Sequence, residues 1–137
     1  MIKITERQLE IIEAAGKLLT ESGVSGLTIK NIAKEMEFSE SAVYRHFSSK
    51  EEIILAMLNY LSESMNMRLS TICKSQASSV QRLKDVFQSQ LDFFEANPNF
   101  VVAVFSDGLF EESQRINEAI QRIMSVNMKN VIPVVAQ

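Results

Sequence analysis

The stretch of residues 28–52 constrains the fold of this chain more than any other. It reads as a short helix, a tight turn, a second short helix and the start of a long one. Helices this short bury little surface alone, so they need close mutual contact at a fixed angle. Ala33 leaves room for a crossing helix, Glu37 falls in the turn, and Val43 points a branched apolar side chain back at the first helix. These offsets are typical of a helix-turn-helix, although many helical hairpins share them.

The residues around this pattern make it more specific. They are the IA of residues 32–33, the VYRHF of residues 43–47 and the SKEE of residues 49–52. Here the sequence resembles the DNA-binding region of the TetR family of bacterial transcription regulators. The resemblance covers the N-terminal part well and the remainder only as a helical body. It implies an all-α chain whose second short helix enters the major groove of DNA.

We therefore predict two domains. Residues 1–48 form a three-helix helix-turn-helix domain that binds DNA, and residues 49–137 form a helical domain for ligand binding and dimerisation. The resemblance implies two further long helices, which pair with their copies in a dimer, and the sequence ends at Gln137 without them. The second domain is therefore expected to lack its last two helices.

Capping residues and apolar periodicity give the helix boundaries. The first helix runs from Thr5 to about residue 22, with a capping box of Thr5 and Gln8 and with Gly23 as its stop. Helices at about 29–35 and 40–47 follow, capped by Thr28 and Ser39. A long helix then runs from a Ser49 cap to about residue 75.

Three more helices are expected, at about residues 80–96, from residue 98 to a kink or end near Gly108, and at about 113–131. The first has one apolar stripe, made of Leu83, Phe87, Leu91 and Phe94. The last is expected to bury Ile116, Ile120, Ile123 and Met124.

Charge is distributed unevenly along the chain. The net charge of −3 by itself argues against a nucleic-acid partner. Residues 1–50 carry seven basic and seven acidic side chains, whereas residues 51–137 carry seven basic and ten acidic ones. The first part thus becomes a basic surface only if Lys30, Arg45, His46 and Lys50 share a face.

The exposed side of the second short helix is the candidate DNA-reading surface. Burial of Val43 and Phe47 leaves Tyr44 and Arg45 outward, which is unusual for a merely solvated face. Arginine suits guanine edges or phosphates, and a tyrosine hydroxyl suits phosphate oxygens. From the residues alone, a plain helical surface remains the alternative.

The resemblance extends this surface to specific positions. It implies phosphate contacts from Thr28, Lys30, Tyr44, His46 and Lys50, and positions near the base edges for Glu40, Ser41, Ala42 and Arg45; Ser39, the cap, completes the predicted DNA-binding set. One position departs from the family, which usually has glycine where this chain has Glu37. That position often needs a positive φ, which costs a non-glycine residue roughly 1–2 kcal/mol.

An effector cavity is also implied by the resemblance. Its candidate lining residues are large and apolar, and each could equally be an ordinary core residue: Met57, Leu61, Met65, Phe87, Leu91, Phe94, Phe105 and Phe110.

Other classes of protein find little support. There is no nucleophile paired with a base, no Glu-x-x-His pair, no glycine-rich phosphate loop and one histidine only, so we predict no enzyme, no cofactor and no metal site. The single cysteine, Cys73, excludes an intrachain disulfide. Neither a signal peptide nor an apolar run of roughly 18 residues is present, so we expect a cytoplasmic protein without a membrane partner.

The sequence therefore predicts a ligand-responsive transcriptional regulator. We expect a repressor that releases double-stranded operator DNA when a small-molecule effector binds the C-terminal domain, and a homodimer for a full-length chain. The alternative is a helical adaptor that uses its helix-turn-helix to bind another protein.

Overall fold

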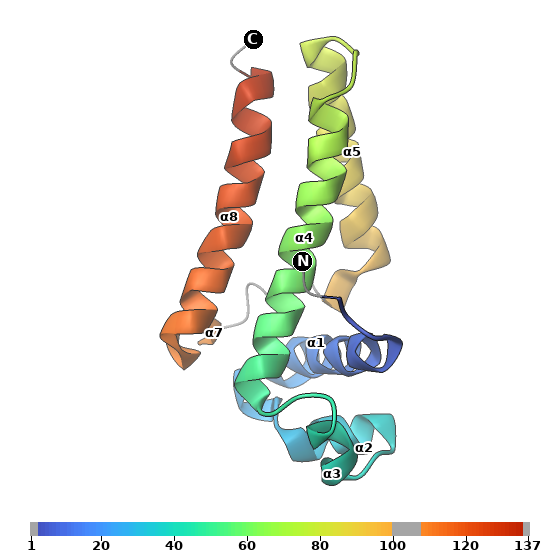
Figure 1. Ribbon diagram of the computed structural model, residues 1–137, viewed down its shortest axis with the longest axis vertical. Helices are drawn as coiled ribbons and strands as arrows, with labels where there is room; N and C mark the ends of the chain where they lie inside the picture. The colour runs from blue at the N-terminus through green and yellow to red at the C-terminus, as the bar shows by residue number, and fades with distance from the viewer. Residues whose placement is uncertain (1–2, 100–107, 136–137) are drawn as a thin grey trace.

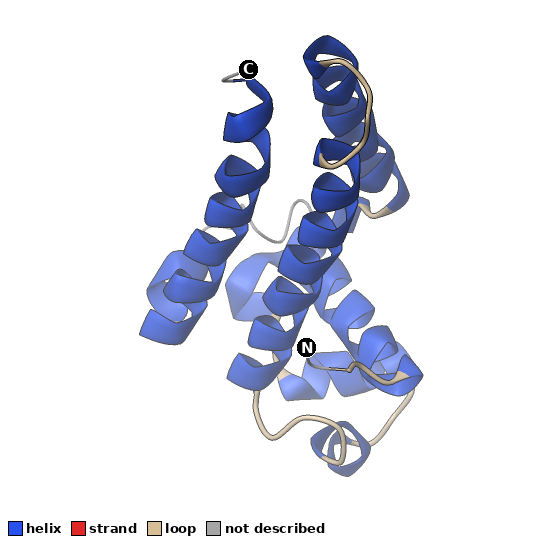
Figure 2. Ribbon diagram, turned by 45° about the horizontal axis from the view of Figure 1, so that its top comes forward, coloured by secondary structure: helices blue, strands red, loops and turns tan. Residues whose placement is uncertain are grey.

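The computed structural model describes residues 3–99 and 108–135, and every regular element in these two ranges is a helix (Figure 2). The predicted all-α class is confirmed. The helices are α1 (Glu6–Gly26), α2 (Ile29–Met36), α3 (Glu40–Tyr44), α4 (Lys50–Cys73), α5 (Ser79–Ala96), α7 (Leu109–Glu112) and α8 (Gln114–Val135). Within these ranges, none of the helices combines the length and hydrophobicity that crossing a membrane requires.

The long helix α4 is the centre of the molecule. Figure 1 shows α1, α2 and α3 gathered at its N-terminal end, with α5 along one side and α8 along the other. Ile53, Met57 and Leu69 of α4 are fully buried. Their neighbours come from both parts of the chain, so the buried residues form one continuous cluster from α1 to α8. The predicted domain boundary at residues 48–49 falls in the loop before α4, and it remains a prediction.

The N-terminal caps formed as predicted. Thr5 and Gln8 make a complete capping box, since each backbone N–H bonds the other's side chain at 3.1 Å. The hydroxyls of Thr28, Ser39 and Ser49 each accept a bond from the N–H three residues on. Each of these side chains satisfies a donor that a helix start leaves free, and this sets where α2, α3 and α4 begin.

Two boundaries in the first part differ from the prediction. Helix α3 was expected to reach Phe47 but ends at Tyr44, because the N–H of His46 bonds the Val43 carbonyl three residues back, at 3.0 Å, and the chain continues as a turn. Helix α1 continues to Gly26, although Gly23, the predicted stop, adopts a positive φ of 70° and kinks it. Leu27 and Ile32 are fully buried below this kink.

The second part contains the larger correction. Leu83, Phe87, Leu91 and Phe94 do share one stripe, but it is not core: Phe87 and Leu91 are 63% and 60% exposed. Helix α5 instead buries Val86 and packs Phe93 against the core. In α8, Ile116, Ile120 and Ile123 are buried as predicted, whereas Met124 is half exposed.

The region of the predicted sixth helix lies mostly outside the described residues. Gly108, where this helix was expected to kink or end, has a φ of 83° and stands directly before α7; the helix itself is not tested. The short helix α7 was not predicted. Its Leu109 is fully buried and Ser113 separates it from α8, with the Ser113 hydroxyl accepting a bond from the Ile116 N–H at 3.1 Å.

Candidate nucleic-acid interface

Helices α2 and α3 pack through the residues that the spacing predicted. Ala33 and Val43 are buried against each other's helices, and α2 and α3 are in direct contact. Between them Glu37 has φ 58° and ψ 38°, in the left-handed region. The N–H of Phe38 then bonds the Ala33 carbonyl at 2.8 Å, which satisfies a carbonyl that the helix end leaves free. The tight turn therefore uses the backbone angles that favour glycine.

This geometry gives a testable expectation for stability. Because Glu37 is held at positive φ, Glu37→Gly relieves strain of roughly 1 kcal/mol, partly offset by the larger unfolded-state entropy of glycine. We expect the midpoint of thermal unfolding to stay unchanged or rise by up to about 4 °C. The matched control is Lys34→Gly in the last turn of α2, where φ is helical and glycine costs about 1 kcal/mol. Equal losses of stability in both variants would contradict the role of the turn.

Most of the predicted DNA-binding residues lie open to solvent. Thr28, Lys30, Ser39, Glu40, Ser41, Tyr44 and Arg45 are exposed, and Ala42 is half-buried. Thr28 and Ser39 use a hydroxyl oxygen as a cap acceptor, which leaves the hydroxyl hydrogen able to donate to a phosphate. Tyr44 is 51% exposed, so a large ring with a polar tip stands out from α3.

Two predicted contacts are placed differently from the others. Lys50 Nζ lies 3.3 Å from the Val24 carbonyl and 3.2 Å from Oε1 of Glu112 on α7. His46 is half-buried and lines a cavity of about 470 Å³ where α1, the loop before α4, α4 and α8 meet. Both side chains are less exposed to solvent than Arg45.

One basic residue was missed. Lys34 is exposed on α2 four residues after Lys30, a spacing that puts two side chains on the same face of a helix. The ammonium of Lys17 pairs with the carboxylate of Glu35. This hydrogen bond raises the pKa of Lys17. Lys34 could have been identified in the sequence from its position four residues after Lys30.

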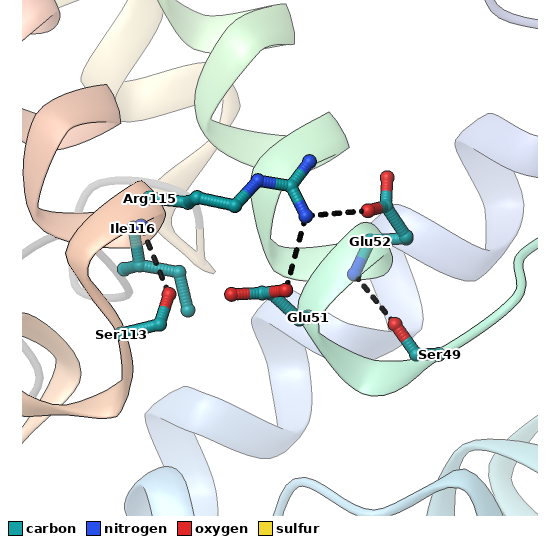
Figure 3. Close-up of polar contacts among 6 residues, drawn as sticks. All are labelled: Ser49, Glu51, Glu52, Ser113, Arg115 and Ile116. Atoms are coloured by element: carbon teal, nitrogen blue, oxygen red, sulfur yellow. Dashed lines mark hydrogen bonds and ion pairs between the residues drawn. The ribbon is translucent and has the colours of Figure 1, made fainter.

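An ionic link between the two parts of the chain was also missed. Arg115 Nη1, from the first turn of α8, lies 3.1 Å from Oε2 of Glu51 and 2.9 Å from Oε1 of Glu52 (Figure 3). The hydrogen bond that Arg115 donates to the Glu52 carboxylate, followed by the negative charge of that carboxylate, raises the pKa of Arg115. Together with Lys50–Glu112, this link joins the first turn of α4 to α7 and α8. No local sequence signal exists for contacts more than sixty residues apart.

The predicted effector-cavity residues fall into separate groups. Met57, Leu61 and Met65 belong to α4 and are buried in the core. Phe87, Leu91 and Phe94 line an open groove of about 470 Å³ between α5 and α8, whose described lining carries no charged side chain. Phe105 lies outside the described residues, as does the side chain of Phe110. The lining of this groove includes none of Met57, Leu61 and Met65.

Comparison with known proteins decides the family. Residues 11–57, which span the last part of α1 through the first part of α4, match the model of bacterial regulatory proteins, tetR family. Residues 11–57 therefore form a DNA-binding domain of the TetR-family type. The resemblance of residues 28–52 is thereby confirmed.

Individual relatives extend the comparison beyond the matched domain. The nucleoid occlusion factor SlmA of Vibrio cholerae is 30% identical over 122 residues, which are 88% of this chain and 62% of that protein. The SlmA of a Marinomonas species is 27% identical over 133 residues, which are 95% of this chain and 68% of that protein. The chain thus spans 62% to 68% of the length of these two relatives.

Solved structures support the same fold. The ketosteroid transcriptional regulator KstR2 of Mycobacterium tuberculosis superposes with a TM-score of 0.83 at 24% identity, covering 98% of this chain and 69% of that one. A TetR-family transcriptional regulator from Bordetella parapertussis gives a TM-score of 0.84 at 21% identity, covering 95% and 67%. At these identities the likeness establishes the architecture alone.

Proposed function

We propose that this TetR-family chain is a ligand-responsive repressor that binds operator DNA through α2 and α3 as part of a homodimer. A small-molecule effector binds among the helices that follow α3. It favours a dimer in which the distance between the two DNA-binding domains no longer fits the operator. Such a ligand shifts the equilibrium only by the difference between its affinities for the two spacings. In this role the chain acts by binding and carries out no catalysis.

The observation that carries the proposal is the exposed face of α3. Tyr44 and Arg45 stand in solvent at the end of a helix fixed by the Ser39 cap and the left-handed turn at Glu37. The capped start of α2 presents Thr28 and Lys30 beside it. An exposed aromatic hydroxyl and a guanidinium on a rigid short helix suit phosphate and base-edge contacts.

Selection of binding sites from random duplexes tests the proposal directly. We expect enrichment of one half-site sequence, and an affinity for it that falls steeply as salt rises, because phosphate contacts release counterions. Failure to enrich any sequence, together with binding that ignores salt concentration, would instead favour the protein-interaction adaptor.

The sequence relatives suggest a second candidate role. Those proteins are nucleoid occlusion factors, and the similarity runs across most of this chain. In that role the same face binds DNA at the nucleoid without the need for an effector. Deletion of the gene followed by imaging of division over the nucleoid distinguishes this role from repression of a target gene.

Lys50 gives a prediction for the phosphate contacts. If Lys50 leaves Glu112 to contact a phosphate, Lys50→Ala weakens binding to cognate and random duplexes alike and lowers the salt slope by about one unit. The matched variant Glu112→Gln frees the lysine, so it should bind both duplexes more tightly. Anisotropy titrations at several salt concentrations measure both effects. An unchanged slope in Lys50→Ala would mean that Lys50 serves only the contact between α4 and α7.

A further inference from the structure

Arg68 holds a fixed position between α4 and α5. Its Nη1 donates to the Ser89 carbonyl at 3.2 Å, the Ser89 hydroxyl at 3.0 Å and Oε1 of Gln90 at 3.2 Å. The guanidinium lies over the ring of Phe93, 4.3 Å from its centre. Three acceptors at one nitrogen and a ring beneath the plane leave this side chain little freedom to rotate.

The opposite edge of the same guanidinium is vacant. Nε and Nη2 are shielded from solvent and have no hydrogen-bond partner in the described parts of the chain. The N–H bonds of these two atoms point in the same direction, so they form the two-pronged edge that arginine uses to hold a carboxylate. None of the ion pairs among residues 3–99 and 108–135 involves Arg68. Burial lowers the pKa of Arg68, as expected for a cation without a counter-charge.

A buried charge without a partner lowers the stability of a fold. An apolar side chain of similar volume would fill the same space between α4 and α5 without the loss of hydration. The packing of α4 against α5 therefore explains the hydrogen bonds of Nη1. It does not explain why Nε and Nη2 are buried without a partner. A cation that is held rigidly and lacks a partner is suited to bind an anion that arrives from outside.

The surroundings of Arg68 offer room for such an anion. Arg68 lines a pocket of about 420 Å³ whose wall includes Ser89, Phe93 and Ala96, a volume in the range of small-molecule sites. Asp85 and Asp92 stand at the same pocket, and each accepts a hydrogen bond from the glutamine four residues earlier on α5. Asp92 is exposed and Asp85 is half-buried, so solvent screens the repulsion of an anion by Asp92 fully and that by Asp85 in part.

We propose that Arg68 anchors the carboxylate of the effector, which is an organic acid whose apolar or aromatic part lies against Phe93. The vacant Nε and Nη2 donate to the two carboxylate oxygens after a small shift of the side chains that cover them. This assignment rests on the proposed ligand-responsive function and adds the chemical class of the ligand. It ties the ligand to α4 and α5 together, since Arg68 belongs to the first and Phe93 to the second.

Thermal unfolding with a panel of acids tests the assignment without DNA. The probes are sodium alkanoates of different lengths and phenylacetate, each compared with its primary amide at equal ionic strength. We expect one or more acids to raise the unfolding midpoint of the wild type by several degrees, while the matching amides do not. Arg68→Gln should weaken the binding of that acid at least roughly tenfold, because it removes a charge-assisted pair of hydrogen bonds.

Two further variants make the result specific. Lys84→Gln removes a charge from the exposed side of α5 and should respond to the acid like the wild type. Arg68→Lys keeps the charge but loses the two-pronged edge, so it should bind the acid less tightly than the wild type. The assignment is wrong if no acid stabilises the wild type more than its amide does, or if Arg68→Gln retains the response. Operator binding is measured separately, so loss of repressor function and loss of this site give different results.

Discussion

Arg45→Ala is expected to weaken binding to the selected operator by about 1–3 kcal/mol, with a much smaller loss on random duplex. Arg45 is exposed at the end of α3, and its backbone is held by bonds from its N–H to the carbonyls of Ser41 and Val43. A guanidinium presented from a fixed backbone can donate two bonds to one guanine edge, and alanine removes both. Anisotropy titrations of both duplexes at one salt concentration give the two losses.

Lys129→Ala is the matched control for this experiment. It removes the same charge from an exposed position on α8, far along the chain from the proposed interface, and should leave both affinities unchanged. Equal losses on operator and random duplex in Arg45→Ala would make Arg45 a phosphate contact only. No loss on either duplex would remove this face of α3 from DNA binding.

The proposed interface was predictable because its determinants are local. Thr28 and Ser39 cap their helices through bonds that span three residues, and Ala33 and Val43 are buried as their spacing predicted. The positive φ of Glu37 followed from the resemblance, because the family usually has glycine at this turn position. These patterns involve only a few neighbouring residues, so they can be recognised in the sequence without knowledge of the rest of the fold.

Contacts between distant segments had no such signal. Glu51 and Glu52 look like ordinary acids at a helix start, where they also suit the positive end of the dipole. Only the packing of α8 beside α4 brings Arg115 to them. The same holds for Arg68, whose vacant edge is defined by the positions of Ser89 and Gln90 on another helix.

The apolar stripe of α5 shows a different limit. Periodicity identifies the apolar side of a helix, but it does not identify what covers that side. Val86 and Phe93 pack on the core, while Phe87 and Leu91 face solvent beside α8. An apolar stripe therefore predicts burial somewhere in the functional assembly, and not always within the single chain.

The exposed apolar stripe of α5 leads to a prediction about the association of copies of this chain. Val80, Phe87, Leu91 and Phe94 of α5 and Met124, Met128 and Ile132 of α8 are all at least 40% exposed. Helices α5 and α8 contact each other, and five of these side chains line the uncharged groove between them: Phe87, Leu91, Phe94, Met128 and Ile132. A continuous surface of this kind, when it exceeds roughly several hundred Å², usually marks a protein contact. We therefore expect the chain to self-associate weakly through α5 and α8.

Sedimentation velocity over a range of concentrations measures this association, and Phe87→Glu combined with Met128→Glu should abolish it. Buried charges at a contact between copies oppose association, while the exposed positions of both residues spare the fold. The two DNA-binding domains of a dimer must sit about 34–36 Å apart on one face of DNA to bind a palindrome. A weakly associated chain is therefore expected to show little preference for a palindrome over a half-site. A tight dimer that persists on dilution and strongly prefers the palindrome would contradict this expectation. If that dimer also survived both substitutions, its interface would lie on a surface other than α5 and α8.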